Sequence, residues 1–169
     1  MDAGQVPENA APLRLTLDTN LPQELWKDQD KKAHVETLLR LGAEGRVALA
    51  VTARIHEDIP AEPLSSRLAE LPELGIAETG SVTRLGFWVL GRDQLGSDVF
   101  ATFEAEIRAS GAREPDWRDL DHLHAHMLQG RDVFVTWERR ILALAEVLKS
   151  RFGIVVMTPE ALIESLPSI

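Results

Sequence analysis

The sequence predicts an α/β domain of three layers, in which a central, mostly parallel β-sheet is covered by helices on both faces. Two observations carry this prediction. Short apolar stretches typical of strands alternate with stretches of helical periodicity from Leu13 onward, and such alternation favours right-handed crossovers and a parallel sheet. The stretch 47–52, Val-Ala-Leu-Ala-Val-Thr, is continuously apolar with β-branched ends, which is typical of a strand covered on both faces.

Length and composition indicate one domain. The chain has 169 residues, enough for a sizeable core. Residues 1–12 are polar and contain two prolines, so we expect a flexible lead-in followed by a single domain over 13–169. The sequence has no apolar run that could span a bilayer, no secretory signal and no cysteine, which favours a cytoplasmic protein without membrane association.

The elements of the first half are expected from their periodicity. Three leucines of the first strand alternate with polar residues, and Val35, Leu38 and Leu39 follow the spacing of a buried helical stripe that ends at Gly42. The glycine-rich segment 72–97 gives no clear pattern beyond an extended stretch over 82–90. The expected elements are a strand over 13–17, a helix over 28–41, a strand over 47–52, and short helices over 53–59 and 65–71.

The second half continues the alternation. Val99, Phe103 and Ile107 recur every four residues, which predicts a helix. Pro159 is expected to open a short final helix. The other expected elements are helices over 98–110, 119–129 and 138–151 and strands over 133–136 and 154–157.

Four acids stand where this topology brings chain segments together. Asp18 ends the first strand, and Glu57 lies about one turn into the helix after the second. Asp119 opens the helix that leads into the strand over 133–136, and Glu138 lies just past that strand. Because parallel strands end at one edge of the sheet, where ligands of such folds bind, we expect the four acids to meet there.

Clustered carboxylates indicate a metal site. Four carboxylates a few ångströms apart repel one another, and their pKa values rise unless a positive charge lies between them. Mg²⁺ prefers oxygen ligands, usually one or two carboxylates plus water and substrate phosphate. A site of this kind suits metal-assisted hydrolysis of a phosphodiester.

Each acid also has a structural explanation, as a turn or cap residue, part of a solvated helix face, or a first-turn acid that complements the helix dipole. Neighbouring acids remain alternatives at two of the four positions. These are Asp58 beside Glu57, and Asp116 or Asp121 beside Asp119.

Other side chains near these acids have two readings as well. His122 and His126 have the spacing of a helical zinc pair, or else His122 packs beneath the acid while His126 is partly exposed. Arg139 and Arg140 either steer a phosphate backbone or belong to a solvated helix turn. Trp137 either stacks on a base or packs in the core.

Together these residues resemble a PIN domain. The matching pieces cover most of the chain from 13 to 166, and they are Leu-Asp-Thr-Asn over 17–20, Val-Thr-Ala-Arg-Ile-His-Glu over 51–57, Asp-Leu-Asp-His-Leu over 119–123 and Phe-Val-Thr-Trp-Glu over 134–138. The order and spacing of the pieces carry the resemblance. It implies an α/β/α fold and a Mg²⁺- or Mn²⁺-dependent ribonuclease activity. The family includes the toxins of bacterial toxin–antitoxin pairs.

The resemblance also implies roles for particular residues. Asp18 and Asp119 would bind the metal, with Glu57 as a further acid, and Asn20 and Thr136 would make polar contacts to the site or substrate. Asp121, Glu57 and Glu138 remain alternative metal ligands, and Arg139 is expected to contact the substrate. An antitoxin or regulatory protein and a homodimer are the partners to expect besides RNA.

One residue departs from the family pattern. The family commonly has Asp or Asn at the position of Glu138. The formal net charge of −9 also opposes nucleic-acid binding through the overall field of the protein. An inactive PIN-like scaffold that binds RNA or a protein partner is therefore the alternative to a nuclease.

Overall fold

The computed structural model describes residues 11–27, 30–80, 82–83, 94–95, 98–110 and 116–167. In these ranges five strands form one sheet in the order β3-β2-β1-β6-β7, with every pair parallel. The strands are β1 (Leu13–Leu17), β2 (Val47–Thr52), β3 (Ile76–Thr79), β6 (Val133–Val135) and β7 (Val155–Met157). Two short strands, β4 (Val82–Thr83) and β5 (Gln94–Leu95), pair with each other.

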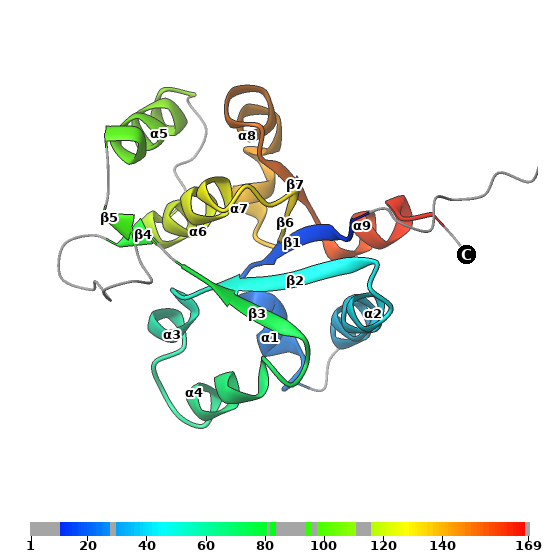
Figure 1. Ribbon diagram of the computed structural model, residues 1–169. Helices are drawn as coiled ribbons and strands as arrows, with labels where there is room; N and C mark the ends of the chain where they lie inside the picture. The colour runs from blue at the N-terminus through cyan, green and yellow to red at the C-terminus, as the bar shows by residue number, and fades with distance from the viewer. Residues whose placement is uncertain are drawn as a thin grey trace, which may run out of the picture.

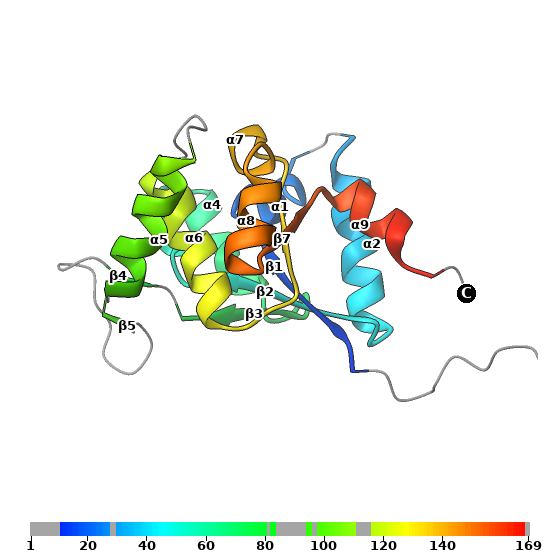
Figure 2. The same cartoon turned by 90° about the horizontal axis from the view of Figure 1, so that it is seen from above.

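Helices cover both faces of the sheet, which confirms the predicted three-layer α/β/α fold (Figures 1 and 2). One face carries α1 (Asn20–Glu24), α2 (Lys32–Ala43), α3 (Ile55–Asp58), α4 (Leu64–Arg67), the 3-10 turn Leu68–Glu70, and α9 (Pro159–Ser165), which packs beside α2. The other face carries α5 (Asp98–Ala109), α6 (Trp117–Leu128), α7 (Arg139–Leu142) and α8 (Ala145–Phe152).

Two apolar cores separate the layers. Alternate residues of β1 and β6, among them Leu15 and Val135, belong to the core under α1 and α2. Phe134, between two such residues, belongs to the core under α6 and α8. Because successive side chains of a strand point to opposite faces, β6 and β7 supply both cores, and this explains their continuously apolar sequences.

Several expected elements differ from the structure. The helix predicted over 138–151 is broken at Ala143 and Leu144, where the Leu144 N–H bonds to the Ile141 carbonyl three residues back. The helix predicted over 28–41 begins at Lys32. Strand β3 was not predicted, because it is a short edge strand with Ile76 as its buried apolar residue. Most of the extended stretch expected over 82–90 lies outside the described residues.

In the part of the chain that the structure describes, no helix combines the length and apolar character needed to cross a membrane.

Candidate functional site

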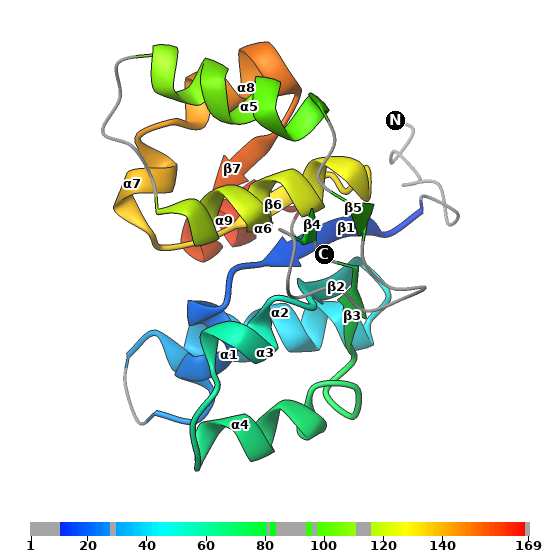
Figure 3. The ribbon, with the colours of Figure 1, turned by 90° about the vertical axis from the view of Figure 1, so that its left-hand side faces the viewer.

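Asp18 and Thr136 lie side by side at the carboxyl edge of the sheet. The register pairs Leu17 with Val135, and the backbone N–H of Asp18 continues this pairing with a 3.0 Å bond to the Val135 carbonyl. The Thr136 hydroxyl donates to Asp18 Oδ2, and Asn20 Nδ2 donates to the same oxygen at 2.9 Å. These two donors fix the orientation of a carboxylate that is only 7% exposed. Figure 3 shows β1 running toward this edge, where α1 and α7 lie.

Asp119 approaches the same edge from the first turn of α6. Its Oδ2 accepts a 3.2 Å bond from the N–H of Asp116, which closes a capping box at the start of the helix. The pKa of Asp119 is raised to about 6, and burial is the largest cause. The charges of Asp18 and Glu138 also raise it, and the Arg140 guanidinium lowers it. The charges of Asp18 and Glu138 are therefore close enough to act on Asp119.

Glu138 is tied to the edge by its backbone and to α7 by its side chain. Its N–H donates to Thr136 Oγ1 at 2.9 Å, so one hydroxyl links Glu138 to Asp18. Its Oε1 caps α7 and accepts from Arg140 N at 3.3 Å and Nε at 3.2 Å. The structure thus brings Glu138 to the site, with its carboxylate shared with a guanidinium.

The acid of α3 that faces Asp18 is Asp58, the alternative to Glu57 that spacing left open. Asp58 Oδ2 accepts from the Thr19 hydroxyl at 2.9 Å, and the Asp58 charge contributes to the raised pKa of Asp18, for which burial is the largest cause. Glu57 instead forms an ion pair with Arg54, with 3.1 Å between Nη1 and Oε2. Glu57, expected to join the other acids at the edge, is therefore replaced there by Asp58, because the Glu57 carboxylate is paired with Arg54.

Asp121 faces away from Asp119. Its side chain is 1% exposed, and its Oδ2 lies 3.0 Å from Arg54 Nη1. Arg54 also lies 3.7 Å from Asp58, so it joins α3 to α6 behind the site. The two aspartates of α6 therefore have different surroundings, and Asp119 is the one placed among the site carboxylates.

The buried ring of His122 connects Thr52, at the end of β2, with Asp58 and Thr19. Its Nδ1 lies 2.6 Å from Thr52 Oγ1, and its Nε2 lies 2.6 Å from Asp58 Oδ2 and 3.3 Å from Thr19 Oγ1. The His122 charge lowers the pKa of Asp18 against the larger effect of burial. His122 thus packs beneath the acid, as one of its two predicted roles required.

His126 contacts a different partner. Its Nδ1 lies 2.8 Å from Thr16 Oγ1, and burial lowers its pKa to about 4. The expectation that His126 is partly exposed was wrong, since the residue is 2% exposed. The partners of His122 and His126 differ, so the pair has the spacing of a zinc site but not its convergence.

The donor atoms at the edge fit a hard divalent cation. Asn20 Oδ1 is buried without a hydrogen-bond partner among the described residues, and it belongs to the amide that orients Asp18. Within the described ranges no three His, Asp or Glu side chains are grouped closely enough to hold a metal ion together. Mg²⁺ commonly takes only one or two carboxylates and completes its shell with water. The pair Asp18 and Asp119 fits this requirement.

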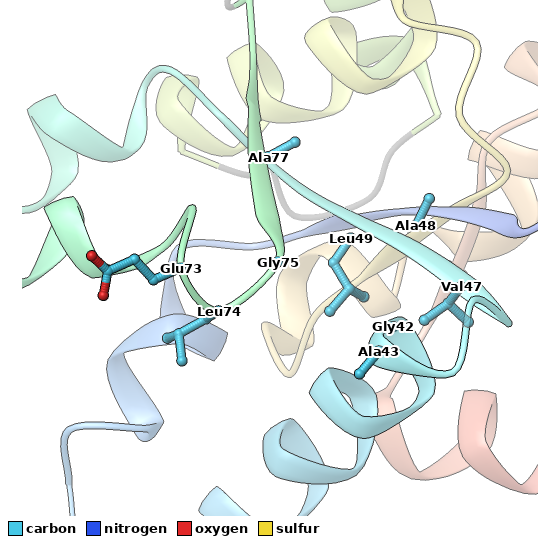
Figure 4. A pocket seen from close by; sticks show the side chains of 9 residues that line it. All are labelled: Gly42, Ala43, Val47, Ala48, Leu49, Glu73, Leu74, Gly75 and Ala77. Atoms are coloured by element: carbon cyan, nitrogen blue, oxygen red, sulfur yellow. The ribbon is translucent and has the colours of Figure 1, made fainter.

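A cavity of about 460 Å³ lies at the opposite edge, between the end of α2 and the amino ends of β2 and β3 (Figure 4). Small and apolar residues line it, and Glu73 is the one charged residue in its lining. Ligands of open parallel sheets bind at the carboxyl ends of the strands. The carboxylate edge is therefore the candidate site.

Comparisons with known proteins return neither a matching family model nor a matching curated protein.

Proposed function

We propose that the protein is a PIN-like, metal-dependent ribonuclease that hydrolyses RNA phosphodiester bonds at Asp18 and Asp119. The observation that supports this most is the meeting of Asp18, Asp119 and Glu138, from three separate chain segments, at the carboxyl edge of β1 and β6. A carboxylate whose pKa is raised by neighbouring negative charges is unfavourable for stability, and such groups cluster at functional sites.

Each residue has a distinct task in this proposal. Asp18 and Asp119 hold Mg²⁺ or Mn²⁺, and Thr136 and Asn20 keep the Asp18 carboxylate oriented for that purpose. The bound ion would supply positive charge to the phosphate and make a water molecule more acidic. Arg139 is exposed at the start of α7 beside Glu138, where a phosphate of the RNA can reach it.

Cleavage assays with a matched pair of variants test this function. We expect Mn²⁺-dependent cleavage of RNA by the wild-type chain, and a loss of at least about 100-fold in Asp18→Asn, because one charged ligand is removed. Asp132→Asn is the control, since Asp132 is exposed and accepts from the Arg14 N–H at the opposite edge of the sheet. An Asp18→Asn variant with full activity refutes the proposal.

The shared carboxylate of Glu138 favours a second candidate, an inactive scaffold that binds RNA or a protein. Arg140 occupies Oε1 of Glu138 through two N–H groups, which reduces its availability to a metal. Titration calorimetry separates the candidates. Mn²⁺ binding that Asp119→Asn weakens supports the nuclease, and folded protein that takes up no Mn²⁺ supports the scaffold.

A toxin-like role would require an antitoxin or another regulatory partner. Growth arrest on expression that Asp18→Asn relieves would support this role, and co-purification of a small protein would identify the partner. Sedimentation of the purified chain would show whether it forms a homodimer.

A further inference from the structure

Trp137 lies between two residues of the candidate site. Thr136, on one side, donates its hydroxyl to Asp18, and Glu138, on the other, acts on the pKa of Asp119. Trp137 lies just past β6, and its partner Glu160 lies in the first turn of α9, which follows β7. The indole is therefore placed at the same carboxyl edge of the sheet as Asp18 and Thr136.

The indole is held in one orientation. Its Nε1 donates to both carboxylate oxygens of Glu160 in α9, at 2.9 and 3.0 Å, and the half-buried ring packs against the core beneath α1 and α2. Glu160 in turn lies 3.6 Å from His34 of α2. A ring anchored in this way loses little conformational freedom when a ligand stacks on it.

One face of the ring is covered by a cation. The exposed Lys31 at the start of α2 places Nζ 4.8 Å from the centroid of the Trp137 ring. The attraction of an exposed ammonium group for an indole is weaker than the stacking of a base on it. A base can therefore displace Lys31 from the ring, and the ammonium group then remains close to the phosphates of the bound strand.

We propose that Trp137 is the stacking platform for an unpaired base of the RNA that the site binds. The exposed side chains of Lys31 and Arg139 bind phosphates of the same strand. The inference rests on the proposed nuclease function for the chemistry, but stacking itself requires no metal. Bases within a duplex are already stacked on one another, so only a single-stranded segment presents a free face to the indole.

Binding of labelled oligonucleotides in EDTA tests the platform. Fluorescence anisotropy would follow a ten-residue oligoadenylate, the same ribose-phosphate chain without bases, and a ten-base-pair RNA duplex. The variants are Trp137→Leu, which removes the ring, and Trp137→Phe, which keeps an aromatic face. Trp26→Leu is the control, because Trp26 is also half-buried and packs against the same core. Thermal unfolding verifies that each variant is folded.

We expect Trp137→Leu to weaken oligoadenylate binding about 5- to 100-fold, to leave binding of the base-free chain unchanged, and Trp137→Phe to restore most of the loss. Lys31→Gln should lower the slope of log Kd against log salt by about 0.7. Tighter binding of the duplex, equal losses for the base-free chain, or an equal loss in Trp26→Leu would overturn the proposal.

Cleavage with Mn²⁺, measured in parallel, keeps this inference separate from the nuclease proposal. Base-dependent binding without cleavage would retain the platform and refute the nuclease. Cleavage with no effect of Trp137→Leu on the binding or cleavage of oligoadenylate would retain the nuclease and refute the platform.

Discussion

His122 Nε2 lies 2.6 Å from Asp58 Oδ2, and this contact joins α6 to α3 directly behind the Asp18 carboxylate. The pair is shielded, with side-chain exposures of 3% and 13%. Burial raises the pKa of Asp58, but the hydrogen bonds and charge of His122, with contributions from Thr19 and Arg54, lower it more, so Asp58 stays ionised. A buried ionised acid beneath Asp18 is thus part of how the site is assembled.

Removal of the His122 ring should destabilise the folded protein. His122→Ala removes the buried partner of the Thr52 hydroxyl and the closest partner of Asp58. We therefore expect the free energy of unfolding to fall by about 2–4 kcal/mol. His56→Ala is the control, because His56 is exposed where it meets Glu78 at 2.6 Å, and its loss should cost about 1 kcal/mol at most. Urea unfolding measures both, and equal effects would contradict a supporting role for His122.

The hydroxyl of Thr136 should keep the pKa of Asp18 lower than burial alone would make it. Burial raises the pKa of Asp18 and the Thr136 hydrogen bond lowers it, so Thr136→Val should raise it further and weaken Mn²⁺ binding about 10-fold at pH 7. Thr136→Ser keeps the hydroxyl and should bind nearly as the wild type does. Calorimetry measures both affinities. A valine variant with unchanged affinity would show that the hydrogen bond does not serve the metal site.

Stability should respond to pH through Asp119. Its pKa of about 6 in the folded protein lies above the ordinary aspartate value of 3.8, so its stabilising contribution is complete below pH 3.8 and is lost as the pH rises through 6. Asp119→Asn should therefore stabilise the metal-free protein at pH 7 relative to pH 4, by roughly 1 kcal/mol after allowance for solvent screening.

Urea unfolding of wild type and Asp119→Asn at the two pH values measures this difference. Carboxyl NMR provides the check: the Asp119 pKa should fall below 6 in Asp18→Asn, because the neighbouring negative charge is gone. An unchanged pKa in that variant would mean that the two carboxylates do not interact.

Arg54 and Asp121 form the buried ion pair behind the site, and substitution of Arg54 should destabilise the protein more than substitution of Asp121. Arg54→Met removes the guanidinium at 3.0 Å from a carboxylate that is 1% exposed, and we expect a loss of about 3 kcal/mol. Asp121→Asn should cost less, since Arg54 keeps Glu57 at 3.1 Å and Asp58 at 3.7 Å. Chemical denaturation of both variants decides the order, and the reverse order would show that Asp121 has the better alternative partners.

Periodicity and βα alternation were sufficient to predict the fold and to place several of the expected residues at the carboxyl edge of the sheet. The strand over 47–52 has its predicted bounds, and Asp18, Thr136 and Glu138 meet because they follow strands that end together. These placements depend on topology, which the sequence pattern specifies. They do not depend on the rotation of a short helix.

The choice between neighbouring acids depends on that rotation. Glu57 and Asp58 are adjacent in α3, a helix of 4 residues, and consecutive helical residues point about 100° apart. Only tertiary contacts, here those of Asp58 with Thr19 and His122, decide which acid faces the site. The burial of His126 was missed for a similar reason, since its partner Thr16 lies 110 positions away in the chain.

Crystals soaked in Mn²⁺ test the central claim most directly. We expect an anomalous density peak within bonding distance of Asp18 and Asp119, with the remaining ligands supplied by water, and no such peak in crystals of Asp119→Asn. A saturating soak of well-ordered wild-type crystals that leaves the space between Asp18 and Asp119 without anomalous density would contradict the assignment of this edge as a metal-dependent active site.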